Sequence, residues 1–152
     1  MTEPIPSESP IEIATAFVEA ITAGDTVNMA ALMADNYTWR LLPAALGVPA
    51  KNKRQYLLQS AKLGRIFATL KVHIRSPLDV VQSGDTVVIH ATSEGQMATG
   101  APFQNECIMI LRCEGGKVYS MMEFMDSEVM RVTLDAGDGA GWKLLQETHD
   151  ED

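Results

Sequence analysis

In the first third of the chain, apolar residues recur every three to four positions, which is the spacing of amphipathic helices. The first helix is expected over 10–23, because Ser9 has the side chain of an N-cap and Gly24 suits the position after a helix end. Two more short helices are expected over 26–36 and 53–67. Between them, the alternating segment 37–41 predicts a strand.

From residue 70 onward the spacing changes to alternation with turns between the runs, which predicts an antiparallel meander. Helices grouped ahead of an antiparallel sheet are typical of an α+β domain. A long curved sheet with helices across its concave face would leave a cavity for a ligand between them. The expected strands cover 70–81 with a break at Pro77, 86–98, 103–112 and 118–124, and a short helix follows over 128–134.

The 152 residues are expected to form one domain. Its hydrophobic share of 46% and charged share of 21% are those of a globular protein, which excludes a disordered or fibrous chain. The folded domain is placed at 10–134. A flexible Pro- and Glu-rich N-terminus precedes it over 1–9, and a flexible, Gly-rich acidic tail follows over 135–152.

Charge and composition argue against several classes of partner. The net charge of −8 is unlike that of nucleic-acid binders, which carry a basic surface for phosphate. There is no apolar run of 18 residues and no leader pattern, so we expect no membrane insertion and a cytoplasmic location. Cys107 and Cys113 lack the spacing of metal ligands, and we expect neither a metal nor another cofactor.

Positive charge is concentrated in the middle of the chain. The window from Leu41 to Leu78 contains seven Lys or Arg residues and no Asp or Glu. Such a stretch would guide an anionic ligand, contact the acidic tail of the same or another subunit, or form a solvated helix face.

Three segments give the chain a resemblance to a known family. They are Tyr37–Pro43 followed by Leu46-Gly47, the strand start Phe103–Glu106, and the ending over 116–127. With the order of elements over 10–134, they resemble SnoaL-like proteins of the nuclear transport factor 2-like superfamily. The resemblance implies a cone-shaped α+β fold, in which three N-terminal helices close a central cavity against a curved antiparallel sheet. The chain is most similar to small fungal members, several of which act on polyketides or terpenoids.

The resemblance also implies which side chains face the cavity, since residues two apart on a strand share a face. The implied inward sets are Met121, Glu123 and Met125 on the last strand, Asn105, Cys107, Met109 and Leu111 on its neighbour, and Tyr37, Trp39 and Leu41 on the first strand.

Departures from two related enzymes argue against their mechanisms. The carboxylic acid of ketosteroid isomerases falls at Met109, which has no proton to donate. Limonene epoxide hydrolase resembles the chain at Tyr37 and Glu123, but its Arg and Asp fall near Ala91 and Ser93. Neither steroid-type isomerisation nor direct epoxide hydrolysis by those mechanisms is therefore expected.

Glu123 is the main candidate for chemistry. If its carboxyl faces inward among methionines, burial raises its pKa toward the range of a general acid or base near neutral pH. Asn105 is the second catalytic candidate, as a hydrogen-bond partner of a ligand carbonyl or of Glu123. The alternatives are a surface Glu123, a Glu123 paired with an Arg, and an Asn105 that only satisfies a loop.

The candidate pocket residues combine polar groups with adaptable apolar side chains. Ordinary core packing is the alternative for the aromatic residues and the methionines, and a structural role is the alternative for the histidines. His90 also has the parity opposite to Ala91 and Ser93. The candidates are Tyr37, Trp39, Met109, Met121, Met125, His73 and His90.

The leading hypothesis is a cofactor-free isomerase, cyclase or dehydratase that acts by general acid–base catalysis on a small, mostly apolar, oxygenated molecule of polyketide or terpenoid type. Glu123 would transfer the proton, while Asn105, Tyr37 and Trp39 orient the substrate. The alternatives are a non-catalytic binding module and a dimeric scaffold whose own side chains fill the cavity. A homodimer is expected in each case, because an open sheet leaves an uncovered face.

Overall fold

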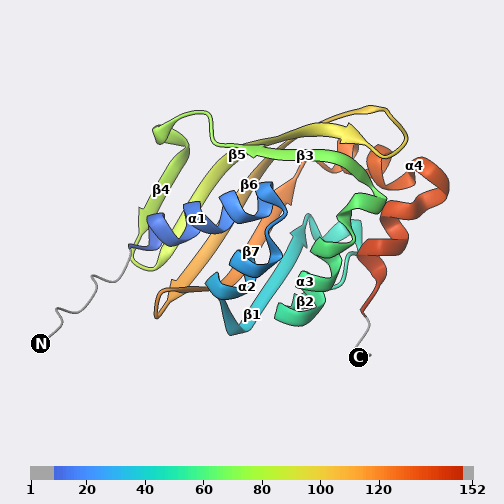
Figure 1. Cartoon of the computed structure of the whole chain (residues 1–152). Coiled ribbons are helices and arrows are strands. Elements are labelled where there is room, and N and C mark those ends of the chain that lie inside the picture. Colours follow the sequence, from blue (N-terminus) through green and yellow to red (C-terminus); the bar gives the residue numbers. More distant parts are fainter. Residues whose placement is uncertain (1–8, 149–152) are drawn as a thin grey trace, which may run out of the picture.

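The structure, a computed structural model, describes residues 9–148 and shows a curved sheet with helices on one side (Figure 1). The helices are α1 (Pro10–Ala23), α2 (Thr26–Leu32), α3 (Lys53–Ala61) and α4 (Ser127–Gln146). The strands are β1 (Met33–Leu42), β2 (Lys51–Asn52), β3 (Phe67–His73), β4 (Val80–Ser83), β5 (Thr86–Met97), β6 (Pro102–Glu114) and β7 (Lys117–Met125).

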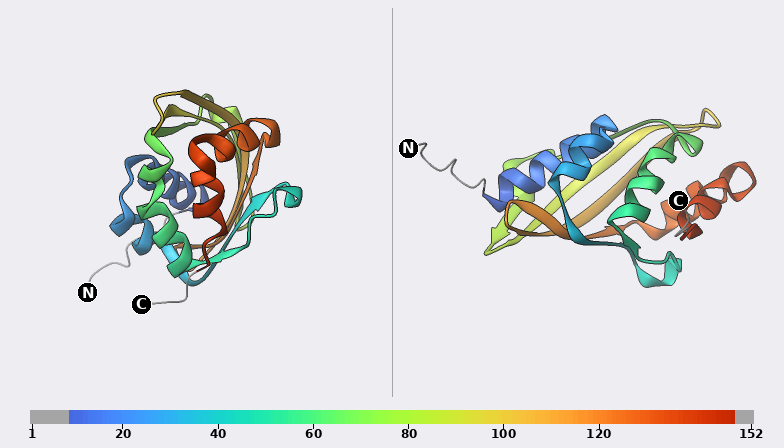
Figure 2. Two further views of the ribbon diagram at one scale, coloured as in Figure 1. Left: turned by 90° about the vertical axis from the view of Figure 1, so that its right-hand side faces the viewer. Right: turned by 60° about the horizontal axis from the view of Figure 1, so that its bottom comes forward.

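The strand order in the sheet is β2-β1-β7-β6-β5-β3, and β4 pairs with β5 outside this path. β1 pairs with β7 in parallel, whereas the other pairs are antiparallel. The sheet curves around α3 and α4 in the left view of Figure 2. The predicted α+β class, with helices closing a curved and unclosed sheet, is confirmed.

Local sequence features set the bounds of α1. The Ser9 side chain accepts a hydrogen bond from the backbone N–H of Glu12 at 3.3 Å, and Gly24 ends the helix at φ 65°. Phe17 and Val18 lie on the buried face of α1, against the concave side of the sheet. This burial of apolar surface holds the helix in place.

Two predicted boundaries are wrong. α2 ends at Leu32, and β1 starts at Met33 rather than at residue 37, because the fully buried Met33 side chain and pairing with β7 favour the extended backbone. α3 ends at Ala61, and a 3₁₀ turn follows over Leu63–Arg65. Phe67 opens β3 instead of ending a helix, and its ring packs 4.8 Å from that of Phe103 on β6.

The predicted flexible tail over 135–152 is a further correction, because α4 continues to Gln146. Its backbone leaves helical geometry at 136–139 and then resumes, so the second half folds back on the first. Leu144 and Leu145 are buried there, and Gly141 packs so closely on Leu134 that a Cβ would lie 2.8 Å from its Cδ2. The expectations for 1–8 and 149–152 lie outside the described residues.

The basic stretch contacts the end of α4 in the same chain. Lys62 and Arg65 lie 3.2 and 3.7 Å from carboxylate oxygens of Glu147, and the buried Lys51 ammonium donates to the Glu147 carbonyl. Of the three alternatives for this stretch, contact with the acidic tail of the same subunit is therefore present in the structure.

Within residues 9–148, no helix has the length and apolar character needed to cross a membrane.

Candidate active site

A cavity of about 110 Å³ lies between the concave face of the sheet and the helices. A larger depression of about 800 Å³ between α2 and α3 opens to solvent and is lined by none of the candidate residues. The cavity wall is mostly apolar, with one carboxylate. Its lining comes from α1 (Val18, Ile21), β1 (Trp39, Leu41), α3 and the following turn (Tyr56, Gln59, Ser60, Leu63, Ile66), β3 (Phe67, Leu70, Val72), β5 (Ser93), β6 (Phe103, Cys107, Met109), β7 (Glu123, Met125) and α4 (Met130, Leu134, Leu145).

Glu123 supplies this carboxylate from the middle of β7. Its neighbours in register are Met109 on β6 and Leu41 on β1, and all three side chains line the cavity. Trp39 Nε1 donates a hydrogen bond to Glu123 Oε1 at 3.1 Å. Glu123 lines the cavity, which rules out a position on the outer surface. Within residues 9–148 it makes no ion pair, which rules out pairing with an Arg.

Burial among apolar side chains raises the pKa of Glu123 from 4.5 to about 7, while the Trp39 hydrogen bond acts in the opposite direction. A carboxyl with this pKa is present in both its neutral and its ionised form near neutral pH. It is therefore suited to accept a proton and to return it.

Trp39→Phe is expected to raise the pKa of Glu123 further, because it removes a hydrogen bond that favours the ionised carboxylate. ¹³C NMR titration of the Glu123 carboxyl would measure the change. Trp142→Phe is the matched control, since Trp142 donates to Asp135 on α4 instead. An unchanged or lower pKa in Trp39→Phe would contradict a direct role of the indole.

Tyr37 and Trp39 share the concave face of β1 and flank Tyr56 of α3. The Tyr56 ring centroid lies 5.4 Å from that of Tyr37 and 5.4 Å from that of Trp39. Tyr56 and Trp39 line the cavity, whereas Tyr37 is buried next to Phe17 and does not. Burial raises the pKa of both tyrosines well above the usual value, so both hydroxyls stay protonated.

The remaining candidates from the last two strands divide between the cavity wall and the core. Met109 and Met125 line the cavity, and the fully buried Met121 lies in the core. Asn105 is also buried, and its Oδ1 accepts a hydrogen bond at 3.1 Å from the backbone N–H of Asp126, the residue that caps α4. The side chain of Asn105, on β6, therefore contacts the N-cap residue of α4 and does not line the cavity.

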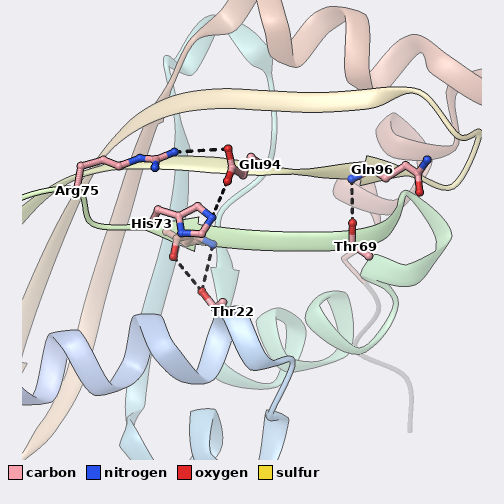
Figure 3. Close-up of polar contacts among 7 residues, drawn as sticks. Thr22, Thr69, His73, Arg75, Glu94 and Gln96 are labelled. Atoms are coloured by element: carbon pink, nitrogen blue, oxygen red, sulfur yellow. Dashed lines mark hydrogen bonds and ion pairs between the residues drawn. The ribbon is translucent and has the colours of Figure 1, made fainter.

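Neither candidate histidine lines the cavity, which differs from the expectation. His73 Nε2 lies 2.8 Å from Glu94 Oε1, in an ion pair without hydrogen-bond geometry, and Arg75 approaches the same carboxylate (Figure 3). His73 points away because the side chain of Val72, the preceding residue on β3, faces the cavity.

His90 lies on the outer face of β5, since its neighbour Ala91 is buried on the inner side. Its two ring nitrogens lie 3.3 Å from Asp79 Oδ1 and 2.8 Å from Glu106 Oε2. Hydrogen bonds to Glu106 and then to Asp79 raise the pKa of His90.

The polar side of the cavity is provided by α3, on which the sequence analysis named no candidate residue. Tyr56, Gln59 and Ser60 all line it. Their spacing of three and four residues places them on one face of a helix, and this pattern is visible in the sequence. The spacing of apolar residues along a helix does not distinguish polar side chains that border a cavity from those that face solvent.

Other reactive groups add little to the site. Burial raises the pKa of Cys107 to about 12, so its thiol stays protonated and is a poor nucleophile. Among residues 9–148, no group of three or more His, Cys, Asp or Glu side chains is placed to hold a metal ion.

Comparison with known proteins agrees with this architecture. The sequence profile described as "SnoaL-like domain" matches residues 14–121. No curated protein matches the sequence.

Solved structures that share the fold include the following three. PrhC of Penicillium brasilianum has a TM-score of 0.78 at 19% identity, over 91% of this chain and 95% of that one. AusH of Aspergillus nidulans has a TM-score of 0.67 at 23% identity, over 82% and 88%. IdmH of Streptomyces antibioticus, a candidate polyketide cyclase, has a TM-score of 0.70 at 19% identity, over 84% and 99%.

At 19–23% sequence identity, the structural similarity shows that these proteins share the fold. The family match covers more than half of the chain and agrees with the resemblance found in its strands. The chain therefore belongs to the SnoaL-like domain family and has the nuclear transport factor 2-like fold.

Proposed function

We propose that the protein is an enzyme of the isomerase, cyclase or dehydratase type, in which Glu123 transfers a proton to and from a small, mostly apolar substrate. The observation that carries the proposal is the Glu123 carboxyl itself. It lines an apolar cavity, one indole N–H holds it, and its pKa is raised to about 7. General acid–base catalysis of this kind needs a side chain that reaches the transferred proton and has a pKa near the working pH, and a carboxyl on the cavity wall with a pKa of about 7 is suited to both.

The hydrogen bond from Trp39 supports the assignment of roles. It holds Oε1 of the carboxyl, and within residues 9–148 no group donates to Oε2. In the proposed mechanism Oε2 is the atom that takes a proton from a carbon or hydroxyl group of the substrate. Trp39 is a positioning residue, because it acts through the carboxyl.

The size and lining of the cavity support the proposed substrate class. A cavity of about 110 Å³ suits a molecule or a molecular fragment close in size to one aromatic ring. Met109, Met125 and Met130 form part of its wall, and their flexible thioethers allow it to adapt to a larger ligand. A polyketide or terpenoid unit with an oxygen function matches these properties.

Hydrogen–deuterium exchange of a simple ketone tests the proposal without knowledge of the natural substrate. Cyclopentanone in D₂O with the purified protein should lose its α-protons faster than in buffer alone, with saturation in ketone. The rate should rise with pH through about 7 as Glu123 ionises. Exchange no faster than in buffer across this pH range would contradict the proposal.

A non-catalytic binding module is the second candidate. It is favoured by the cavity lining, because among the lining residues that the structure describes Glu123 is the single carboxylate and none is basic. Saturable binding of cyclopentanone without accelerated exchange would support this alternative.

The homodimer stays a prediction. The outer face of the sheet exposes Ile108 on β6 and Phe124 on β7, which are neighbours in register. Sedimentation velocity would show whether two copies associate, and Phe124→Glu would show whether they do so through this face.

A further inference from the structure

The cavity is long in the direction of the strands. The register places Glu123 of β7 beside Met109 of β6. It places Leu70 of β3 at the level of Phe103 of β6, with Gly95 of β5 between them. All of these except Gly95 line the cavity. Six residues of β6 separate Phe103 from Met109, which is a strand length of about 20 Å. The lined space therefore extends from the level of Glu123 to that of Phe103.

Residues between these two levels line the cavity as well. Cys107 lies one step from Met109 on the same face of β6, and Met125 of β7 is its neighbour in register. At the next step Asn105 contacts the start of α4, but its neighbour Ser93 on β5 lines the cavity in its place. The lining is therefore continuous from one end of this stretch to the other.

The volume of the cavity indicates how wide it is. A space of about 110 Å³ that reaches over several residues of a strand has to be narrow. A narrow space admits an extended carbon chain, which is one methylene group wide, more readily than a compact molecule of the same volume. The proportions of the cavity therefore favour an elongated ligand.

The two ends of the cavity differ in polarity. At one end, the Glu123 carboxyl accepts a hydrogen bond from the Trp39 indole N–H. At the other end, the rings of Phe67 and Phe103 pack with their centroids 4.8 Å apart, and both residues line the cavity. An oxygen atom of a ligand would lose its bonds to water without replacement beside these rings, whereas it finds a polar group beside Glu123. The polarity therefore gives the ligand a direction.

We propose that the substrate is an elongated molecule with a carbonyl or hydroxyl group at one end and an extended apolar chain that runs along β6 to Phe103. This inference rests on the proposed function for the oxygenated end, which lies at Glu123, and it adds the length and the direction of the ligand. Ser93, about midway along the cavity, and Phe103, at its far end, are then specificity-determining residues.

A series of 2-alkanones from 2-butanone to 2-decanone tests the length of the cavity. The Kd values would be measured at pH 5.5 by chemical-shift titration, with the Trp39 indole N–H as the reporter at the polar end. Each added methylene should tighten binding about fourfold until the chain reaches Phe103, and the affinity should then level off. 2-Adamantanone is a compact ketone with the same number of carbon atoms as 2-decanone. It should bind more weakly than 2-decanone, after both Kd values are corrected for partition into octanol.

Ser93→Leu is the test variant, because a leucine at this position fills the middle of the cavity. It should leave the Kd of 2-butanone unchanged and weaken the binding of 2-decanone about tenfold or more. Thr92→Leu is the matched control, since Thr92 precedes Ser93 on β5 and faces the other side of the sheet. It should leave the whole series unchanged.

Phe103→Leu is a second variant, with the opposite expected effect. The smaller side chain at the far end of the cavity should move the point at which affinity levels off to a longer alkanone. Intermolecular NOEs in the complex with 2-octanone give the direction of the chain. The terminal methyl group should contact the Phe103 ring, and the acetyl methyl group should contact the Trp39 indole.

The inference is overturned by any of four results: equal tightening per methylene in wild type and Ser93→Leu throughout the series, tighter corrected binding of 2-adamantanone than of 2-decanone, a terminal methyl group beside Trp39, or no binding of 2-octanone up to its solubility.

Glu123→Gln separates this inference from the proposed function. If the dependence on chain length persists in this variant, the shape of the cavity selects the ligand whether or not Glu123 is catalytic. Accelerated exchange of cyclopentanone by wild-type protein without any dependence of affinity on chain length would refute the elongated substrate and leave the proposed function in place.

Discussion

Glu123→Gln is expected to lower kcat/KM for the ring opening of 5-nitrobenzisoxazole by about 10²–10⁴-fold. In this reaction a base removes the proton on the carbon of the ring, the N–O bond breaks, and a coloured nitrile phenolate forms. A carboxylate in an apolar cavity is a stronger base than one in water, because its pKa is higher and its hydration is lost. Glutamine keeps the shape of the side chain and removes the base.

The rate in wild-type protein should increase with pH through about 7, as Glu123 ionises. Glu106→Gln is the matched control, since Glu106 lies on the neighbouring strand but points to the exposed outer face. It should leave the rate unchanged. Equal rates in wild type and Glu123→Gln would show that another group is the base.

The same substitution is expected to remove a pH dependence of stability. The folded pKa of Glu123 is raised, so its neutral form adds stability below about pH 4.5, and this contribution is lost as pH rises through about 7. Glutamine does not titrate. Between pH 4 and pH 8, the free energy of unfolding of Glu123→Gln should therefore rise relative to that of wild type by about 3 kcal/mol.

Urea unfolding of both proteins at a series of pH values would measure this difference, because the other titratable groups are common to both. The comparison is independent of any substrate. A difference in unfolding free energy that stays constant from pH 4 to pH 8 would mean that Glu123 has an ordinary pKa. The cavity would then lack the property on which the proposed mechanism depends.

Alternation along the strands was enough to group several cavity residues correctly. Trp39 and Leu41, Cys107 and Met109, and Glu123 and Met125 do line the same cavity. The pleat of a strand places residues two apart on one face, so each pair follows from local geometry. The choice between the two faces came from the family resemblance, because alternation alone is symmetric.

The alternating pattern does not predict how far along each strand the cavity extends. Tyr37, Met121 and Asn105 have the inward parity, yet the structure places them beneath or beyond the cavity wall. Where the cavity ends along each strand depends on the helices that cover it. Those helices are positioned by long-range packing, which the local pattern does not report.

The C-terminal segment shows the same limit. Its glycines and acidic residues predict a flexible tail, but Gly137 and Gly139 instead adopt positive φ and turn the chain back onto itself. Leu145 thereby reaches the cavity wall. Whether such a segment folds depends on the apolar surface that it finds on the rest of the domain, and that surface exists only in the assembled structure.

The pKa of the Glu123 carboxyl, measured by NMR in protein labelled with ¹³C at glutamate Cδ, tests the account most directly. The Glu123 resonance is assigned by its absence in Glu123→Gln, and its shift is followed from pH 4 to pH 9. The account predicts a midpoint of about 7. A midpoint near 4.5, the ordinary value of a glutamate, would contradict it.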